Sequence, residues 1–114
     1  IDSILGAMKK KDIGTYFPDN KRRYKNIRSP KMLRPILSDL YKKKFLINNL
    51  DINLICEQPK VSIHRNKIIN SISSLMKLEK DRINLKGKTA EKLGLIGKEK
   101  AIACEVIVSI TKYD

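Results

Sequence analysis

The segment "KGKTAEKLGLIGKEKAIACE", residues 86–105, contains residue types that bind phosphate, above all a Gly-Lys-Thr tripeptide at 87–89. The same tripeptide ends the P-loop of nucleotide triphosphatases. A P-loop also needs a second glycine, five residues before the glycine of the tripeptide, so that the loop can wrap around the phosphates. That position is Arg82, which excludes a P-loop. A polar turn between a strand and a helix can still bind phosphate through backbone N–H groups and the helix dipole. We therefore expect a phosphate site of another kind here.

The composition predicts a folded protein that attracts anions. The 114 residues are enough for one domain, and 41% of them are hydrophobic and 32% charged, which is typical of a folded chain. The 25 basic and 12 acidic residues give a formal net charge of +13. Such a charge attracts nucleic acid, an anionic membrane or phosphorylated metabolites. A surface biased by AT-rich codons, rich in Lys, Ile and Asn, is the simpler explanation of the charge.

Cysteine and histidine usage argues against a disulfide framework and a zinc cluster. Cys56 and Cys104 lie far apart in the sequence, with no C-x-x-C pair, which fits a reducing compartment. His64 is the one histidine, and a zinc site needs about four N or S ligands. No apolar run is long enough for a membrane span, and no targeting segment is visible.

Hydrophobic periodicity predicts a small α/β fold with helices packed on one face of a sheet. The 1–10 stretch is expected to be helical, and 12–28 to be a long loop. Ser29 is expected to cap a helix that contains Pro35. The remaining elements expected are strands at 48–60, 82–87 and 101–112, a helix at 62–76 and a short helix at 91–96.

Three motifs in order resemble one enzyme family. "DIGTYFPDN" is similar to D-I-G-x-x-F-P-D-T-D, "NLDINLICEQPK" to N-x-D-x-T-I-I-A-Q-x-P-K, and "LKGKTAEKLGLIGKEKAIACE" to V-K-A-T-T-T-E-x-L-G-F-x-G-R-x-E-G-I-A. These are motifs of the 2-C-methyl-D-erythritol 2,4-cyclodiphosphate synthases of the non-mevalonate isoprenoid pathway. The match covers nearly the whole chain without gaps.

The resemblance implies a phosphorus–oxygen lyase. In such enzymes the 2-phosphate of 4-diphosphocytidyl-2-C-methyl-D-erythritol 2-phosphate attacks the β-phosphorus, CMP leaves, and a cyclic diphosphate forms. The protein mainly positions groups and neutralises charge. The resemblance also implies a homotrimer with active sites between subunits, and neither nucleic acid nor a membrane as partner.

The first motif carries part of the implied substrate site. Asp12, Ile13 and Gly14 match the residues that contact the methylerythritol part, although a helix or loop cap is an alternative role for Asp12. The matching positions of the flexible substrate loop are Phe17, Pro18, Asp19, Asn20 and Lys21. The last two replace Thr and Asp of the family pattern.

The second and third motifs carry the rest of the implied substrate site. The cytosine-binding loop corresponds to Cys56, Glu57, Gln58, Pro59, Lys60, Val61 and Ser62. The phosphate-binding positions correspond to Lys88, Thr89, Ala90, Glu91, Leu95 and Lys98. Thr89 is the expected catalytic contact to phosphate, with helix capping as the alternative. His64 is expected to have a structural role at a helix start.

The resemblance also implies two divalent cations. Glu91 matches the ligand of a Mg²⁺ or Mn²⁺ ion, with a place in the first turn of a helix as the alternative. The family's zinc ligands correspond to positions upstream of Ile1, so this chain is expected to be one synthase domain, 1–114, that lacks its N-terminal segment and has no zinc ligand of its own.

Two other functions stay open beside the synthase. A catalytically degenerate homologue would explain the substituted motif positions. A basic nucleic-acid-binding module would explain the charge, with "KRRYKNIR" at 21–28 as its basic cluster. The residue bias is typical of a plastid-bearing parasite, which would place the protein in the plastid (apicoplast) stroma. An AT-rich bacterium would place it in the cytoplasm.

Overall fold

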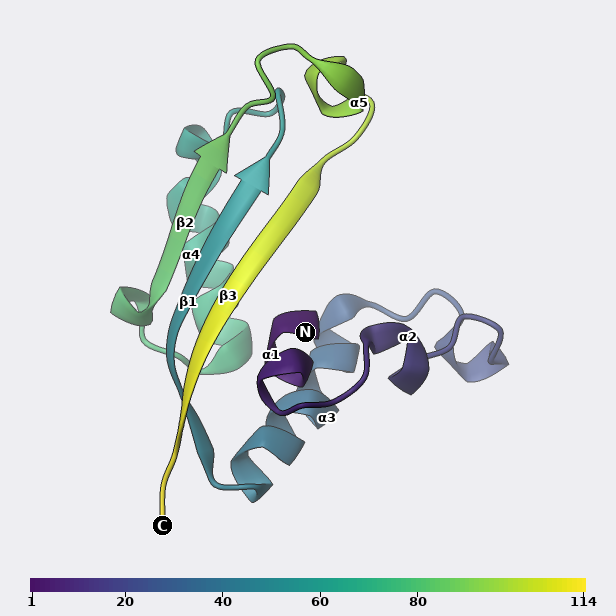
Figure 1. Cartoon of the computed structure of the whole chain (residues 1–114), viewed down its shortest axis with the longest axis vertical. Coiled ribbons are helices and arrows are strands. Elements are labelled where there is room, and N and C mark those ends of the chain that lie inside the picture. The colour runs from purple at the N-terminus through teal and green to yellow at the C-terminus, as the bar shows by residue number, and fades with distance from the viewer. The chain divides into compact units, whose positions relative to one another are not determined.

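The computed structural model describes all residues, 1–114, as an α/β protein with one three-stranded sheet in the order β2-β1-β3 (Figure 1). The chain forms two compact units, residues 1–48 with 108–114 and residues 49–107. Strands β1 (Phe45–Ile55) and β3 (Ala103–Lys112) contribute residues to both units. The predicted α/β class is confirmed, while the packing of all helices on one face stays a prediction.

The first unit is a helical cluster. Helix α1 (Asp2–Ala7) packs on α3 (Ser29–Lys42), and their buried side chains are Ile4, Leu5, Ile36, Leu37 and Leu40. Two short helices, α2 (Ile13–Tyr16) and η1 (Arg22–Tyr24), lie within residues 12–28, so the prediction of a continuous loop there was wrong. Ser29 is the first residue of α3 rather than its cap, because Arg28 occupies the cap position.

The second unit is a β-α-β arrangement built on two parallel strands. Helix α4 (Val61–Met76) connects β1 to β2 (Ile83–Lys88) and packs against β2. Leu50 and Ile52 alternate as buried residues of β1, while Ile83 and Leu85 do so in β2. This alternation confirms the period-2 pattern expected for half-buried strands.

In the second unit, most helices and strands begin and end within a few residues of the positions predicted from the sequence. Strand β1 ends at Ile55 rather than near Pro59, because residues 56–60 turn toward the helix. A 3-10 turn, η2 (Lys80–Arg82), leads into β2. The predicted short helix is present as α5 (Gly94–Gly97), but it starts at Gly94 rather than at residue 91. Glu91 and Lys92 have positive φ angles of 55° and 62°, which cannot continue a right-handed helix.

Candidate functional site

Two of the predicted site segments meet at the carboxyl ends of the parallel strands β1 and β2. Ile55 pairs with Lys88 at the end of the ladder, and the backbone N–H of Cys56 donates to the Lys88 carbonyl at 3.0 Å. The chain then leaves β1 through residues 56–60 and leaves β2 through residues 89–93. Ligands of open α/β sheets bind outside the carboxyl ends of strands, which is where these two loops lie.

The two loops form the walls of a cleft of about 480 Å³, a size that accommodates a nucleotide. The predicted site residues that line it are Cys56, Glu57, Gln58, Lys60, Val61, Ser62, Lys88 and Thr89. Pro59, Ala90 and Glu91 belong to the same loops but do not line the cleft. Neither do Leu95, which lies in α5, and Lys98, which follows α5. Separate motifs that were 26 or more residues apart in sequence thus converge on one cavity.

The cleft carries a positive electrostatic field. Its lining includes Lys60, Arg65, Lys88 and Lys92, against one acidic residue, Glu57. The first turn of α4 also lies there, at Val61 and Ser62, and no side chain caps this helix end. Uncapped N–H groups and the helix dipole favour an anion at this end, so the cleft suits a phosphorylated ligand.

Sequence reasoning missed Arg65, Leu85, Gly87 and Lys92 as residues lining the cleft. Arg65 follows Val61 by one helical turn, so the two share a helix face. That spacing is a signal that could have identified Arg65. Gly87 is required by close packing, because a Cβ atom there would lie 2.7 Å from the Val61 Cβ.

A polar network holds α4 on the strands beside the cleft. Arg65 Nε donates to the Leu85 carbonyl at 3.1 Å, and its Nη2 donates to Asn84 Oδ1 at 3.2 Å. Asn84 Nδ2 donates in turn to Asp51 Oδ1 at 3.1 Å, and Lys86 Nζ donates to Asp51 Oδ2 at 3.0 Å. The hydrogen bond from Lys86 lowers the pKa of the Asp51 carboxyl. Arg65 is therefore held in place by the strand that it contacts.

Glu57 connects the two loops directly. Its Oε1 accepts hydrogen bonds from the backbone N–H groups of Ala90, at 2.8 Å, and Lys92, at 3.3 Å. These N–H groups flank Glu91, in a turn that includes two consecutive residues with positive φ. The second loop is thus hydrogen-bonded to a side chain of the first.

The structure contradicts both helical alternatives for the Thr89–Glu91 segment. Leu93 is the cap residue of α5, so Thr89 does not cap this helix and Glu91 is not in its first turn. Thr89 Oγ1 instead accepts a weak hydrogen bond from the Glu91 N–H at 3.4 Å. The Glu91 carboxylate is exposed and makes no hydrogen bond or ion pair. It is therefore free to bind a ligand.

The donors in this chain fit one of the two expected cations. The chain holds no group of three or more His, Cys, Asp or Glu side chains that could bind a metal ion, so its residues do not form a zinc site. Mg²⁺ is commonly held by one or two carboxylates together with substrate phosphates and water. The free carboxylate of Glu91, two residues from the cleft residue Thr89, fits that donor set.

The Asp12–Lys21 segment belongs to the first unit. Asp12 caps α2, since its Oδ1 accepts from the Thr15 N–H at 3.1 Å and from Thr15 Oγ1 at 2.8 Å. These hydrogen bonds lower the pKa of the Asp12 carboxyl. Asp19, Asn20 and Lys21 are exposed. The capping alternative for Asp12 is confirmed, and its contact with a substrate stays a prediction.

The aromatic residue of the basic cluster 21–28 is used for internal packing. Phe17 and Tyr24 form an edge-to-face pair with ring centroids 5.3 Å apart, and the Arg23 guanidinium lies over the Tyr24 ring at 4.7 Å. Nucleic-acid modules that use aromatic residues stack bases on open ring faces. Tyr24 has one face covered by Arg23 and an edge-to-face contact with Phe17.

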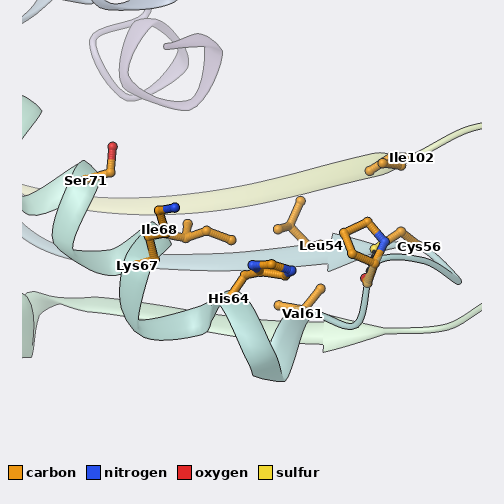
Figure 2. Close-up of a pocket in the computed structure, with 9 residues that line it drawn as sticks. Leu54, Cys56, Val61, His64, Lys67, Ile68, Ser71 and Ile102 are labelled. Atoms are coloured by element: carbon orange, nitrogen blue, oxygen red, sulfur yellow. Dashed lines mark hydrogen bonds between the residues drawn. The ribbon is translucent and has the colours of Figure 1, made fainter.

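A second, apolar pocket of about 430 Å³ lies beside helix α4 (Figure 2). It shares Cys56 and Val61 with the cleft and is lined further by Leu54 and Ile102, with His64, Lys67, Ile68 and Ser71 on the helix side. His64 lies in the first turn of α4, as expected. Its structural role there stays a prediction.

Comparison with known proteins decides the family. A family model described as the YgbB family matches residues 1–111. The chain belongs to the YgbB family. This finding agrees with the resemblance that the three motifs indicated.

Named relatives and a solved structure support the assignment within the YgbB family. The chain is 51% identical, over 99% of its length, to 30% of a bifunctional enzyme IspD/IspF of Pelagibacter ubique. It is 48% identical, over 91% of its length, to 43% of the apicoplast 2-C-methyl-D-erythritol 2,4-cyclodiphosphate synthase of Plasmodium falciparum. The chain thus spans less than half of these two relatives. A structure named IspF (Plasmodium falciparum) CDP complex superposes with a TM-score of 0.87 and 42% identity, covering 99% of this chain and 67% of that one.

Proposed function

We propose that the protein containing this chain is a 2-C-methyl-D-erythritol 2,4-cyclodiphosphate synthase. The observation that carries the proposal is the cleft in which the Cys56–Ser62 loop and the Lys88–Thr89 segment meet. Four basic residues and a helix N-terminus give this cleft the charge that a diphosphate needs. The names of the relatives, including a complex with CDP, indicate the same ligand class.

The cleft suits a ligand with a base at one end and phosphates at the other. The Cys56–Ser62 loop offers backbone groups that can read the edge of a cytosine. Lys88, Lys92 and Lys60 supply cations for the diphosphate. Thr89 supplies a hydroxyl that can donate to a phosphoryl oxygen whose negative charge increases during transfer.

The proposed reaction is an intramolecular phosphoryl transfer. An oxygen of the 2-phosphate forms a bond to the β-phosphorus, and the bond from that phosphorus to the bridging oxygen breaks. CMP leaves with the bridging oxygen and its electron pair. Such transfers need positioning and charge neutralisation more than covalent chemistry by the protein, and the cationic cleft supplies the charge.

Glu91 would hold a Mg²⁺ or Mn²⁺ ion next to the phosphates. When bound, such an ion neutralises charge on the phosphoryl oxygens. No step is assigned to zinc, since the residues of this chain do not form a zinc site.

The remaining proposals concern assembly, the first motif and location. We propose a homotrimer, as the family resemblance implies, and a methylerythritol contact by Asp12–Gly14 and the loop through Lys21.

None of the helices has the length and apolar character that a membrane span needs. The relatives include an apicoplast enzyme and a bacterial one, which are the two sources expected from the residue bias. We accordingly propose a plastid stroma or a bacterial cytoplasm.

The proposal is tested by turnover of the complete natural protein. Purified protein is incubated with the diphosphocytidyl methylerythritol 2-phosphate and Mg²⁺, and CMP and the cyclic diphosphate are followed by ³¹P NMR. Equal amounts of both products confirm the synthase. Tight CDP binding without CMP release would instead identify the catalytically degenerate homologue.

A further inference from the structure

We infer that Glu57 is a positioning residue of the cleft, which sets the conformation of the phosphate-binding loop rather than contacting the base. This inference rests on the proposed function for its ligand. The resemblance alone placed Glu57 among the cytosine-binding residues. The structure shows its carboxylate facing the opposite loop, with Oε1 bonded to the Ala90 and Lys92 N–H groups.

The turn that Glu57 holds has a conformation that needs support. Glu91 and Lys92 both have positive φ, which non-glycine residues seldom adopt, and here two of them are consecutive. An ionised carboxylate only accepts hydrogen bonds, and its bonds to N–H groups are stronger than bonds between neutral groups. Oε1 therefore stabilises the two N–H groups in the orientation that the turn presents.

The other side of the turn is fixed by close packing. A Cβ atom on Gly97 would overlap the backbone of Lys92, so the turn fits against a glycine there. Between Gly97 and Glu57, the Lys92 backbone has little freedom. The side chains that depend on this loop, Thr89 and Lys92, line the cleft. Removing the Glu57 acceptor should release the loop and leave the base-binding loop in place.

The consequence is a selective effect on phosphate recognition. If Glu57 positions the phosphate loop, its loss should weaken CDP binding more than cytidine binding. If Glu57 contacts the base, both affinities should fall by the same factor. If its carboxylate occupies N–H groups that would otherwise bind phosphate, its removal should strengthen CDP binding. These three roles therefore predict different results.

The experiment compares Glu57→Ala and Glu57→Gln with wild type and with the control Glu79→Ala, which changes an exposed glutamate before η2. Isothermal titration of the complete natural protein measures its affinity for CDP and for cytidine. NMR measures hydrogen exchange of the Ala90 and Lys92 amides without ligand.

We expect Glu57→Ala to lower CDP affinity about tenfold, the size typical of losing hydrogen bonds to a charged group. Cytidine affinity should be unchanged, and both amides should exchange faster. Glu57→Gln keeps a side-chain oxygen that can accept both hydrogen bonds. Its CDP affinity and its amide exchange rates should therefore lie close to those of wild type, and Glu79→Ala should match wild type. Equal losses for CDP and cytidine, stronger CDP binding or unchanged exchange would each overturn the inference.

The exchange readout also separates this inference from the proposed function. If wild-type protein binds no CDP and releases no CMP, the proposed function fails. The exchange of the Ala90 and Lys92 amides needs no ligand, and it would still show whether Glu57 holds the turn.

Discussion

At the scale of single residues, Gly87 determines how closely β2 approaches α4. A methyl group at this position would lie 2.7 Å from the Val61 Cβ and 3.1 Å from its Cγ2. The Val61 Cβ is attached directly to the helix backbone, so the side chain cannot rotate away. The strand or the helix must move, and both line the cleft.

We predict that Gly87→Ala destabilises the protein by about 1–3 kcal/mol, the usual cost of overpacking. CDP affinity should fall with it, because Val61 and Lys88 move apart. Urea unfolding measures the stability, and titration with CDP measures the affinity. The control is Gly6→Ala, since a Cβ atom at Gly6 has no neighbour within 4 Å. Equal unfolding midpoints for both variants would contradict the close-packing argument.

Glu91 has a free carboxylate in the loop that follows β2, where we propose that phosphate binds. We predict that Glu91→Gln lowers turnover by about 10²–10³, the usual cost of losing one electrostatic stabiliser. Its melting temperature should be unchanged, because the carboxylate makes no internal bond. CMP release at saturating Mg²⁺ measures the turnover, and a thermal melt measures the melting temperature.

A matched control for Glu91→Gln is Glu99→Gln. Both glutamates are exposed, and both have positive φ, with 63° at Glu99. Near-normal turnover in Glu91→Gln would contradict the proposal that Glu91 binds a metal ion.

At the residue scale, the family resemblance assigned Lys60, Lys88 and Thr89 to one substrate site. The structure brings these three residues together around one cleft, and their contact with a substrate stays a prediction. The left-handed turn at Glu91 and Lys92 was not predicted from the local sequence. Its Ala90 and Lys92 N–H groups donate to Glu57, which is more than 30 residues away in sequence. A local helix pattern carries no information about such a partner.

At the scale of elements, a charged network joins α4, β1 and β2. Asp51 on β1 accepts from Asn84 and Lys86 on β2, and Asn84 accepts from Arg65 on α4. The alternating apolar residues of both strands were visible in the sequence, so the strands themselves were predictable. Their parallel register pairs Asp51 with Asn84, and this register depends on tertiary packing.

This network predicts how stability varies with pH. The hydrogen bond from Lys86 holds the pKa of Asp51 below its ordinary value of 3.8. A lowered pKa means that the contribution of Asp51 is complete above the ordinary value and is lost as pH falls through the lowered one. Asp51→Asn should therefore reduce the fall in unfolding free energy below about pH 4.

Urea unfolding between pH 2 and pH 6 checks the prediction for Asp51. The exposed Asp81 provides the control variant, Asp81→Asn. If the pH dependence of Asp51→Asn equals that of wild type, the Lys86 contact contributes nothing in solution.

At the scale of the whole molecule, exposed apolar side chains indicate an assembly. In the second unit, Ile102 is 61% exposed, Ile107 is 75% exposed and Leu93 is 72% exposed. Several large apolar side chains left in water commonly mark an interface. We predict that the complete natural protein is a homotrimer. Sedimentation equilibrium should give three times the chain mass, and a stable monomer at micromolar concentration would contradict it.

The net charge of +13 is a property of the whole molecule, and it attracts any polyanion. Binding that depends only on this charge should weaken steeply with salt and should not distinguish CDP from other diphosphates. Binding in the cleft should distinguish them, because we propose that the Cys56–Ser62 loop contacts the base. The basic cluster at residues 21–28 is an alternative place for such charge-driven binding.

The most direct test of the central claim is a crystal structure of the complete natural protein with CDP. We predict cytosine against the Cys56–Ser62 loop, and the diphosphate beside Lys88 and Thr89. A diphosphate bound instead at residues 21–28, with the cleft empty, would contradict the assignment of the cleft as the nucleotide site.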